Sequence, residues 1–545
     1  MRSRAKPWGT WALAAVVGLP ALWALAGAVA ALGTPTDWSY LSVSAGVHSL
    51  ALSLWIALSS TALSVWLANG LVRWSVTRVH GARWLAPMLA TPHLAFALTL
   101  ALLIAPTGWL IRVISPSLSG WSTPPDWATV HDPWGLGMVA VLVCKEVPFL
   151  LWVAWSEWQR PDQARRWQHL WATAQTLGHD PAGAWRGVIA PVLWQRLRWP
   201  VVAVWAYGLA VVDVGLAIGP NNPPPLAVQA WQWLLDPEPQ VQGLGAWASW
   251  ILVALTALGS AWIAWAFRAR RRVDTTGPGQ AWMARWRGAS WAAIAGTGLG
   301  LYAALLPLTI VTSFAQLWPF PALWPHTWST RAWQQVLGAP EVWLSTLGLA
   351  TASTALVLVW TVAWLELASA RWQRWLSALA MGLLVCPPLL WLLGLHHAMI
   401  RLHLDSTGWA VLLGHCLAVL PYVMLTLAPA YLGFENRYCQ VAASLGHGWW
   451  SQRWHVKWPS LRAALWRTAA IGFAVSVAQY LPTQWLGAGR VVTVTTEALA
   501  QSSGGQRALT SAWSLAQWLL PWIGFAWATW AAQRRTPHAA ERPAS

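Results

Sequence analysis

Two stretches of sequence decide how this chain is organised: QTLGHDPAGAWRGVIAP at residues 175–191 and ASLGHGWWSQRWHVKWP at residues 443–459. The two phrases have the same length, and they start about half a chain apart. Five aligned positions are identical: Leu177 and Leu445, Gly178 and Gly446, His179 and His447, Val188 and Val456, Pro191 and Pro459. A phrase that recurs at half-chain spacing indicates a duplicated unit.

The surrounding composition is that of an integral membrane protein. Of 545 residues, 57% are hydrophobic and 9% charged, whereas soluble domains average roughly 25% charged residues. The net charge of +17 is divided among many short loops, which favours a membrane orientation signal over nucleic-acid binding. Four cysteines form no C-x-x-C pair and are interpreted as small buried residues. Many of the 52 tryptophans fall where apolar segments meet loops, and we draw no function from their number.

Twelve apolar stretches are each long enough to cross a hydrocarbon core of about 30 Å as a helix. We predict an all-α, polytopic membrane helix bundle, because no alternating ten-residue segments suggest a β-barrel. The first stretch follows a basic N-terminus and resembles a signal peptide, but its length favours a retained helix. The predicted spans are 8–31, 49–71, 84–106, 133–155, 199–219, 244–267, 291–317, 342–366, 375–396, 408–431, 466–486 and 509–530.

The distribution of lysine and arginine predicts the orientation. With the N-terminus placed in the cytoplasm, cytoplasmic segments hold 28 of these residues and outer loops hold 5. This bias predicts that both termini are cytoplasmic. The six-plus-six pattern predicts an N-terminal half at 1–267, a basic linker at 268–290, a C-terminal half at 291–530 and a tail at 531–545.

Both phrases fall in the longest cytoplasmic loop of their half, between its fourth and fifth spans. Each places a glycine in a helix-prone run, where a tight turn with positive φ is the expected use of that residue. We therefore expect a helix, a tight turn, a short helix and re-entry into the membrane. Small residues before the turn, Ala172, Ala174, Ala442 and Ala443, are expected to let another surface approach closely.

The spacing of the two phrases resembles the EAA loop, E-A-A-x3-G-x9-I-x-L-P, of permease subunits in binding-protein-dependent ABC importers. The resemblance covers both halves and implies a MetI-like fold of type I ABC importers, with two homologous six-helix halves. Two loops in one chain resemble the fused permeases of ferric iron and thiamine importers, and the run at 219–239 resembles the YnjC-like branch.

The resemblance implies that loops 172–191 and 440–459 are coupling helices. Each would dock on one copy of a cytoplasmic ATPase, while a periplasmic solute-binding protein delivers a small solute such as ferric iron, thiamine or a polyamine. The protein would lie in a bacterial inner membrane. The implied ATPase-coupling residues are Ala172, Ala174, Leu177, Gly178, His179, Pro191, Gln440, Ala442, Leu445, Gly446, His447 and Pro459.

The glutamate of the family pattern is missing from both loops. It is replaced by Ala172 in the first loop and by Gln440 in the second. Docking is therefore expected to depend on shape and apolar contact. We interpret His179 and His447 as surface residues at a helix start.

A few charged residues interrupt the apolar spans. Lys145 and Glu146 lie near the middle of the fourth span and Asp213 in the outer half of the fifth. Each either lines the translocation path or has a packing role with a partner in a neighbouring helix. Glu366 is expected at a cytoplasmic interface.

Enzyme and metal chemistry find no support in the sequence. None of the three lysines follows a glycine, so no P-loop is present. No residue spacing resembles a metal site or a nucleophile–base pair, and no cofactor is expected. A secondary carrier with twelve spans is the alternative, although its long loop is expected between the halves rather than within each. A membrane enzyme is a third hypothesis.

Overall fold

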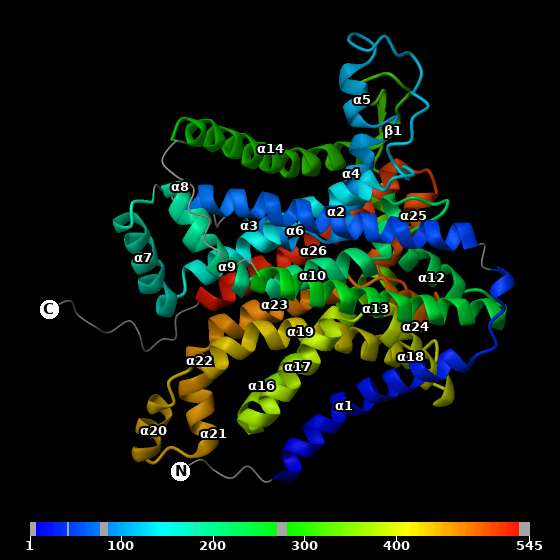
Figure 1. The fold of residues 1–545 in the computed structure, drawn as a ribbon. Helices are drawn as coiled ribbons and strands as arrows, with labels where there is room; N and C mark the ends of the chain where they lie inside the picture. The colour runs from blue at the N-terminus through cyan, green and yellow to red at the C-terminus, as the bar shows by residue number, and fades with distance from the viewer. Residues whose placement is uncertain (1–6, 41–42, 77–84, 180, 270–280, 534–545) are drawn as a thin grey trace.

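The computed structural model describes residues 7–40, 43–76, 85–179, 181–269 and 281–533. Its long helices run roughly side by side (Figure 1). In the described part of the chain, strands β1 and β2 form a two-stranded antiparallel sheet. The predicted helical membrane bundle is thereby confirmed.

The first half is described by this sequence of elements: α1 (Pro7–Ala30), η1 (Ala31–Gly33), η2 (Trp38–Tyr40), α2 (Val43–Val76), α3 (Leu85–Ala90), α4 (His93–Ile104), α5 (Trp109–Ile114), α6 (Leu136–Trp158), α7 (Pro161–Thr176), α8 (Pro181–Ala184), η4 (Trp185–Ile189), α9 (Ala190–Arg196), α10 (Arg198–Ala210), α11 (Asp213–Ile218), α12 (Leu226–Leu234) and α13 (Pro239–Ala269).

The second half repeats much of that order: α14 (Ala281–Ser313), β1 (Ala315–Leu317), β2 (Thr327–Trp328), α15 (Arg331–Leu337), α16 (Pro340–Leu367), α17 (Ala370–Val385), α18 (Pro388–Arg401), α19 (Gly408–Leu432), α20 (Arg437–Ser444), α21 (Trp449–Gln452), η5 (Arg453–Lys457), α22 (Trp458–Ser460), α23 (Arg462–Val477), α24 (Leu481–Gly487), α25 (Val494–Ser503) and α26 (Arg507–Gln533). The run Ser-Thr-Ala-Leu occurs in both α2 and α16, at 60–63 and 353–356.

Four of the predicted spans are broken, so their prediction as continuous helices was wrong. The stretches 84–106, 199–219, 375–396 and 466–486 contain the helix pairs α3–α4, α10–α11, α17–α18 and α23–α24. The two helices of the α17–α18 pair meet at an angle of 103°. Proline explains three breaks, because Pro92, Pro387 and Pro482 lack the N–H that an uninterrupted helix needs.

Within the described residues, eight helices are long and apolar enough to cross a membrane, and the bent pair α17–α18 raises the number to nine. The eight include α1, α2, α6, α13, α14, α16 and α19, together with the segment His93–Ile114. The prediction of twelve spans stays a prediction for the shorter broken helices and for α26.

The first helix of each half crosses onto the other half. Helix α1 packs along α18, where a side chain built on Gly394 would lie 1.5 Å from the carbonyl oxygen of Ala24. Helix α14 packs against α2, where a side chain on Gly70 would meet the ring of Trp291 at 2.1 Å. At these close approaches the two halves pack against each other, and α1 is packed against the rest of the bundle.

One end of the bundle carries a lobe made by both halves, α5 with the β1–β2 hairpin (Figure 1). Its centre is Arg112, which is 2% exposed and donates to the carbonyl oxygens of Trp318 at 3.0 Å and Pro319 at 2.9 Å. The guanidinium lies 4.3 Å from the centre of the Trp318 ring. We call this the outer lobe.

The opposite end carries α7, α8, α20 and α21 (Figure 1). The start of α1 lies there, because the Thr10 hydroxyl donates to the Leu367 carbonyl at the end of α16. The end of α26 lies there as well, since Arg462 donates to the Ala532 carbonyl. Of the predicted linker 268–290, residues 270–280 lie outside the described part and residues 281–290 belong to α14. Of the predicted tail 531–545, residues 534–545 also lie outside it.

Candidate functional site

The two repeated loops fold into the same turn, as the sequence predicts. Helix α7 ends at a turn in which Gly178 has φ of +85°, and α20 ends at a turn in which Gly446 has φ of +86°. The His179 N–H donates to the Ala174 carbonyl at 3.1 Å, and the His447 N–H donates to the Ala442 carbonyl at 3.0 Å. Both are Schellman caps, which place a left-handed residue directly after a helix and favour glycine there.

The similarity continues past the turn with the same spacing. A four-residue helix, α8 or α21, leads into a π-helical turn, η4 at Trp185–Ile189 or η5 at Arg453–Lys457. When the two phrases are aligned, η4 and η5 fall on the same positions. Single π-helical turns widen a helix locally and are frequent at functional sites. We call residues 172–191 the first coupling loop and residues 440–459 the second coupling loop.

The predicted coupling residues divide into an outward and an inward set. Leu177 and Leu445, just before the glycines, are 73% and 74% exposed. Ala174 and Ala442 are 1% and 7% exposed, so these two small residues are buried within their own loop, and their role in letting another surface approach closely stays a prediction. Their position one turn before the cap directs them at the returning segment of their own loop. The other residues of the predicted set, Ala172, His179, Pro191, Gln440, His447 and Pro459, are exposed or half-buried.

Aromatic packing attaches the first coupling loop to the bundle. Trp158 at the end of α6 stacks on Trp167 of α7, with ring centres 5.3 Å apart and an interplanar angle of 10°. Trp185 of η4 lies 6.3 Å from Trp158. Trp167 and Trp185 are both 1% exposed. The inward face of η4 is therefore apolar.

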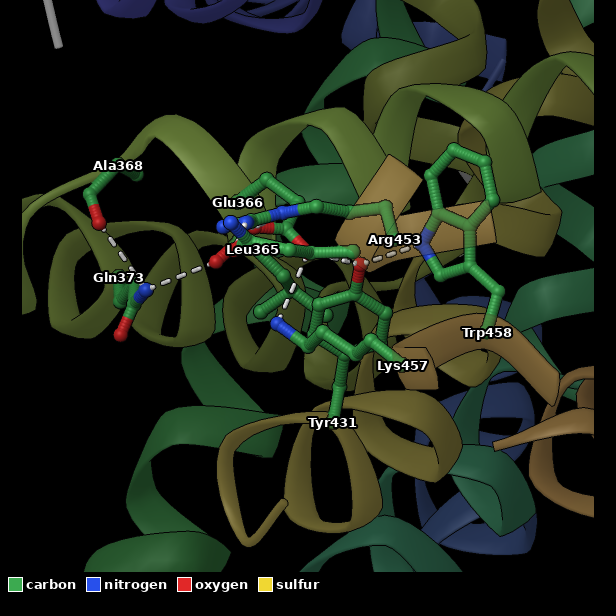
Figure 2. Close-up of polar contacts among 9 residues, drawn as sticks. Leu365, Glu366, Ala368, Gln373, Tyr431, Arg453, Lys457 and Trp458 are labelled. Carbon is green, nitrogen blue, oxygen red and sulfur yellow. Dashed lines mark hydrogen bonds and ion pairs between the residues drawn. The ribbon is translucent and has the colours of Figure 1, made fainter. Parts of the chain in front are cut away.

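Ionic contacts attach the second coupling loop instead (Figure 2). Glu366, at the end of α16, accepts from the Tyr431 hydroxyl at 2.6 Å and from the Lys457 ammonium at 2.9 Å. Its other oxygen accepts from Arg453 at 3.2 Å. The Trp458 indole N–H donates to the Tyr431 oxygen at 3.0 Å. The side chains of Glu366 and Lys457 are 6% and 9% exposed, so Glu366 lies at the end of its helix, as expected, and is buried there by the second coupling loop.

Sequence reasoning missed both attachments. The sequence signal for the attachment of the second coupling loop was the pair Arg453 and Lys457, which are four residues apart, together with one carboxylate, Glu366, at the end of an apolar span. The signal for the first was weaker, since Trp158, Trp167 and Trp185 are three among 52 tryptophans.

In the middle of the bundle, Lys145 bonds to the backbone of a broken helix. Its ammonium donates to the carbonyl oxygens of Met88 and Thr91, both at 2.6 Å. These carbonyls lie at the α3–α4 break, where regular helix bonding stops. Backbone groups at membrane depth must find internal partners, and Lys145, 3% exposed, supplies them.

Glu146 is the next residue of α6 after Lys145. Adjacent residues of a helix point in different directions, so Glu146 has a different partner from Lys145. One of its oxygens lies 3.2 Å from Nε2 of His93, the first residue of α4. The His93 ring lies 4.6 Å from the ring of Tyr207 on α10. Asp213, the first residue of α11, is close enough to His93 for their charges to interact. Helices α6 and α11 thus each bring a carboxylate, Glu146 and Asp213, near one histidine.

Aromatic residues of the second half approach the same region. The Tyr302 hydroxyl of α14 donates to the Cys144 carbonyl at 3.1 Å. Tyr422 of α19, which is 38% exposed, lies in the neighbourhood of Glu146. In the second half, a buried histidine of α19, His415, bonds to hydroxyl groups at a different helix break. Its ring nitrogens lie 2.8 Å from the Ser476 hydroxyl and 2.9 Å from the Thr483 hydroxyl, on either side of the α23–α24 break.

The described residues contain no group of three or more histidine, cysteine, aspartate or glutamate side chains placed to hold a metal ion. The four cysteines, Cys144, Cys386, Cys416 and Cys439, are free thiols and are buried or half-buried.

Comparison with known proteins places this architecture in a family. No protein-family model matches the chain. The inner membrane ABC transporter permease protein YnjC of Escherichia coli (strain K12) is 31% identical over 542 residues. The match covers 95% of this chain and 94% of YnjC, and so includes both halves and both coupling loops. The chain belongs to the family of inner membrane ABC transporter permeases and is a multi-pass transmembrane permease subunit.

Proposed function

We propose that this permease is the membrane subunit of an importer, driven by a separate ATPase through the two coupling loops. The observation that carries the proposal is that both coupling loops have the same Schellman cap and the same π-helical turn at one end of the bundle. We call the protruding turn of each loop, around Gly178 or Gly446, a knob. One apolar side chain per knob, Leu177 or Leu445, is about three-quarters exposed. Two matched knobs fit two copies of one ATPase subunit.

The coupling loops define the cytoplasmic end in this proposal. The start of α1 and the end of α26 lie at the same end, in agreement with the excess of lysine and arginine in those segments. The outer lobe then faces the periplasm, where it is positioned to receive a solute-binding protein. Because Arg112 joins carbonyl groups of the two halves inside this lobe, a protein bound there contacts both halves at once.

Mechanically, we infer that closure of the ATPase dimer draws the two knobs together and opens the opposite end of the bundle toward the binding protein. Each knob is attached to a membrane helix by buried side chains, so a force on the loop reaches the helix. In the first loop that attachment is Trp158 with Trp185, and in the second it is Glu366 with Arg453 and Lys457.

We also propose that Glu146 and Asp213 line the translocation path, whereas Lys145 has a packing role. Lys145 has both carbonyl partners it needs at the α3–α4 break. Glu146 contacts His93, whose side chain is 32% exposed, Asp213 lies near the same histidine, and Tyr422 of the other half lies near Glu146. Two carboxylates among aromatic rings favour a cationic solute.

The importer hypothesis is tested by uptake into proteoliposomes that contain the chain, its ATPase and its binding protein. Changing Gly178 and Gly446 together to valine strains each turn by about 1–2 kcal/mol, since a side chain disfavours left-handed backbone. No atom lies within 4 Å of a side chain built at either glycine, so the strain is confined to the backbone. We expect ATP-dependent uptake to fall more than about tenfold, equivalent to about 1.4 kcal/mol of lost docking.

The matched control is Gly448→Ala, two residues beyond the second turn. Gly448 has φ of −67°, and a side chain built there also meets no atom within 4 Å. Uptake by this variant should equal that of the unmodified chain. Full uptake and full ATPase attachment in the double valine variant would contradict the proposal.

The path is tested separately with Asp213→Asn in the same vesicles. The substitution keeps size and removes charge, so uptake of a cationic solute should fall several-fold while ATPase attachment is unchanged. Asp405→Asn, an exposed change outside the central region, is the control. Unchanged uptake by Asp213→Asn would remove Asp213 from the path without affecting the role of the loops.

A further inference from the structure

A pocket at the base of the first coupling loop is not explained by coupling. Its volume is about 530 Å³, and it lies where the end of α6, the α9–α10 junction and the end of α13 meet. Arginine dominates its polar lining: Arg160, Arg196, Arg198 and Arg268. The carboxylate that lines it is Glu157.

The charges in the pocket do not balance. Glu157 accepts from Arg196 through one oxygen and lies 3.3 Å from Arg160 through the other. Among the described residues that line the pocket, one carboxylate thus serves two of the four arginines, and the lining carries an excess of positive charge. Such an excess attracts an anion, and guanidinium groups suit phosphate oxygens through paired N–H donors.

The other wall of the pocket is aromatic and continues onto an apolar surface. Trp199 and Phe267 line the pocket, and Trp199 is 52% exposed. Along α13, Trp262 and Trp265 are 59% and 63% exposed. Exposed tryptophans at the end of a membrane helix are typical of the lipid–water interface. A ligand with a phosphate next to long hydrocarbon chains would use both walls, whereas inorganic phosphate would use the arginines alone.

We propose that this arginine pocket binds the phosphodiester headgroup of an anionic phospholipid, with the acyl chains along α13. Basic pockets between membrane helices are known to hold such headgroups. Two of these arginines are specific to the first half. When the alignment of the two phrases is continued, the positions of Arg196 and Arg198 correspond to Ala464 and Trp466. The lipid would sit where α6 leads into α7, and so would brace the first coupling loop.

Native mass spectrometry of the chain purified with its ATPase tests the proposal. The complex in detergent is titrated with phosphatidylglycerol or with phosphatidylethanolamine. We expect retention of phosphatidylglycerol at one site that phosphatidylethanolamine does not fill. Arg198→Gln combined with Arg268→Gln leaves Glu157 and its two partners intact and should lower phosphatidylglycerol retention about tenfold or more.

A matched control removes the same charge from the same end of the other half. Arg371→Gln with Arg374→Gln changes two exposed arginines at the start of α17 and should leave retention unchanged. The thermal unfolding temperature of each variant shows whether it is folded.

Each of the following outcomes would overturn the proposal. Equal retention of both lipids by the unmodified chain, or equal retention of phosphatidylglycerol by the folded double variant, excludes a headgroup site. Displacement of the lipid by millimolar inorganic phosphate indicates a site for free phosphate. Unchanged lipid retention with loss of the ATPase indicates that the arginines dock the ATPase. None of these results depends on uptake, so the proposed import function is tested independently.

Discussion

The two coupling loops have the same backbone conformation, but the side chains that they direct inward are apolar in the first loop and charged in the second. At the aligned positions of their π-helical turns, the first loop directs Trp185 and Ile189 inward, and the second directs Arg453 and Lys457 inward. The outward glycine turn is the same in both, with φ of +85° and +86°. The comparison teaches that the shape of the knob does not depend on the chemistry of its attachment.

The difference has energetic consequences. An apolar attachment loses stability gradually as contacts are removed. A buried ionic attachment is more sensitive, because removing one partner leaves an uncompensated charge at a cost of about 3–5 kcal/mol, whereas replacing all partners by apolar residues is often neutral. The second loop should therefore be the one that a single substitution releases.

The largest expected effect follows from Glu366→Leu. Lys457 and Arg453 lose their common carboxylate while their side chains are 9% and 17% exposed. We expect a local loss of about 3–5 kcal/mol, measured as faster amide hydrogen exchange across residues 437–460, with the first loop unchanged. ATP-driven uptake should fall with it.

Two control variants sharpen that prediction. Glu435→Leu removes an exposed ion pair with Arg437 just before the second coupling loop, where the side chains are 54% and 71% exposed, and should change exchange little. The triple change Glu366→Leu, Arg453→Met and Lys457→Met replaces the ionic attachment by an apolar one and should restore most of the protection. If the triple variant exchanges as fast as Glu366→Leu alone, the interior of the loop cannot be apolar, and the comparison with the first loop fails.

Part of this architecture could be predicted from the sequence. The positive φ at Gly178 and Gly446, the order of helix, turn and short helix, and the position of both loops all follow from local signals. A Schellman cap is set by one glycine and the helix before it, so a pattern of a few residues is sufficient.

Other features depend on partners far away in the chain. Lys145 bonds to Met88, 57 residues away, and Glu366 pairs with Arg453, 87 residues away. A run of about 20 apolar residues predicts a helix of spanning length but carries no sign of where it breaks in the absence of proline. The break between α10 and α11 at Val211–Val212 is such a case. The inward direction of Ala174 and Ala442 likewise requires the returning segment to be known.

Photo-crosslinking from the tips of the two coupling loops shows whether the ATPase docks on both of them. A benzoyl-phenylalanine is placed at position 177 or 445, where the native leucines are 73% and 74% exposed, and at position 118 beside the outer lobe, where Leu118 is 82% exposed. We expect the ATPase to be crosslinked from both coupling loops and not from position 118. Crosslinks to the ATPase from position 118, or from neither knob in a complex that still hydrolyses ATP, would contradict it.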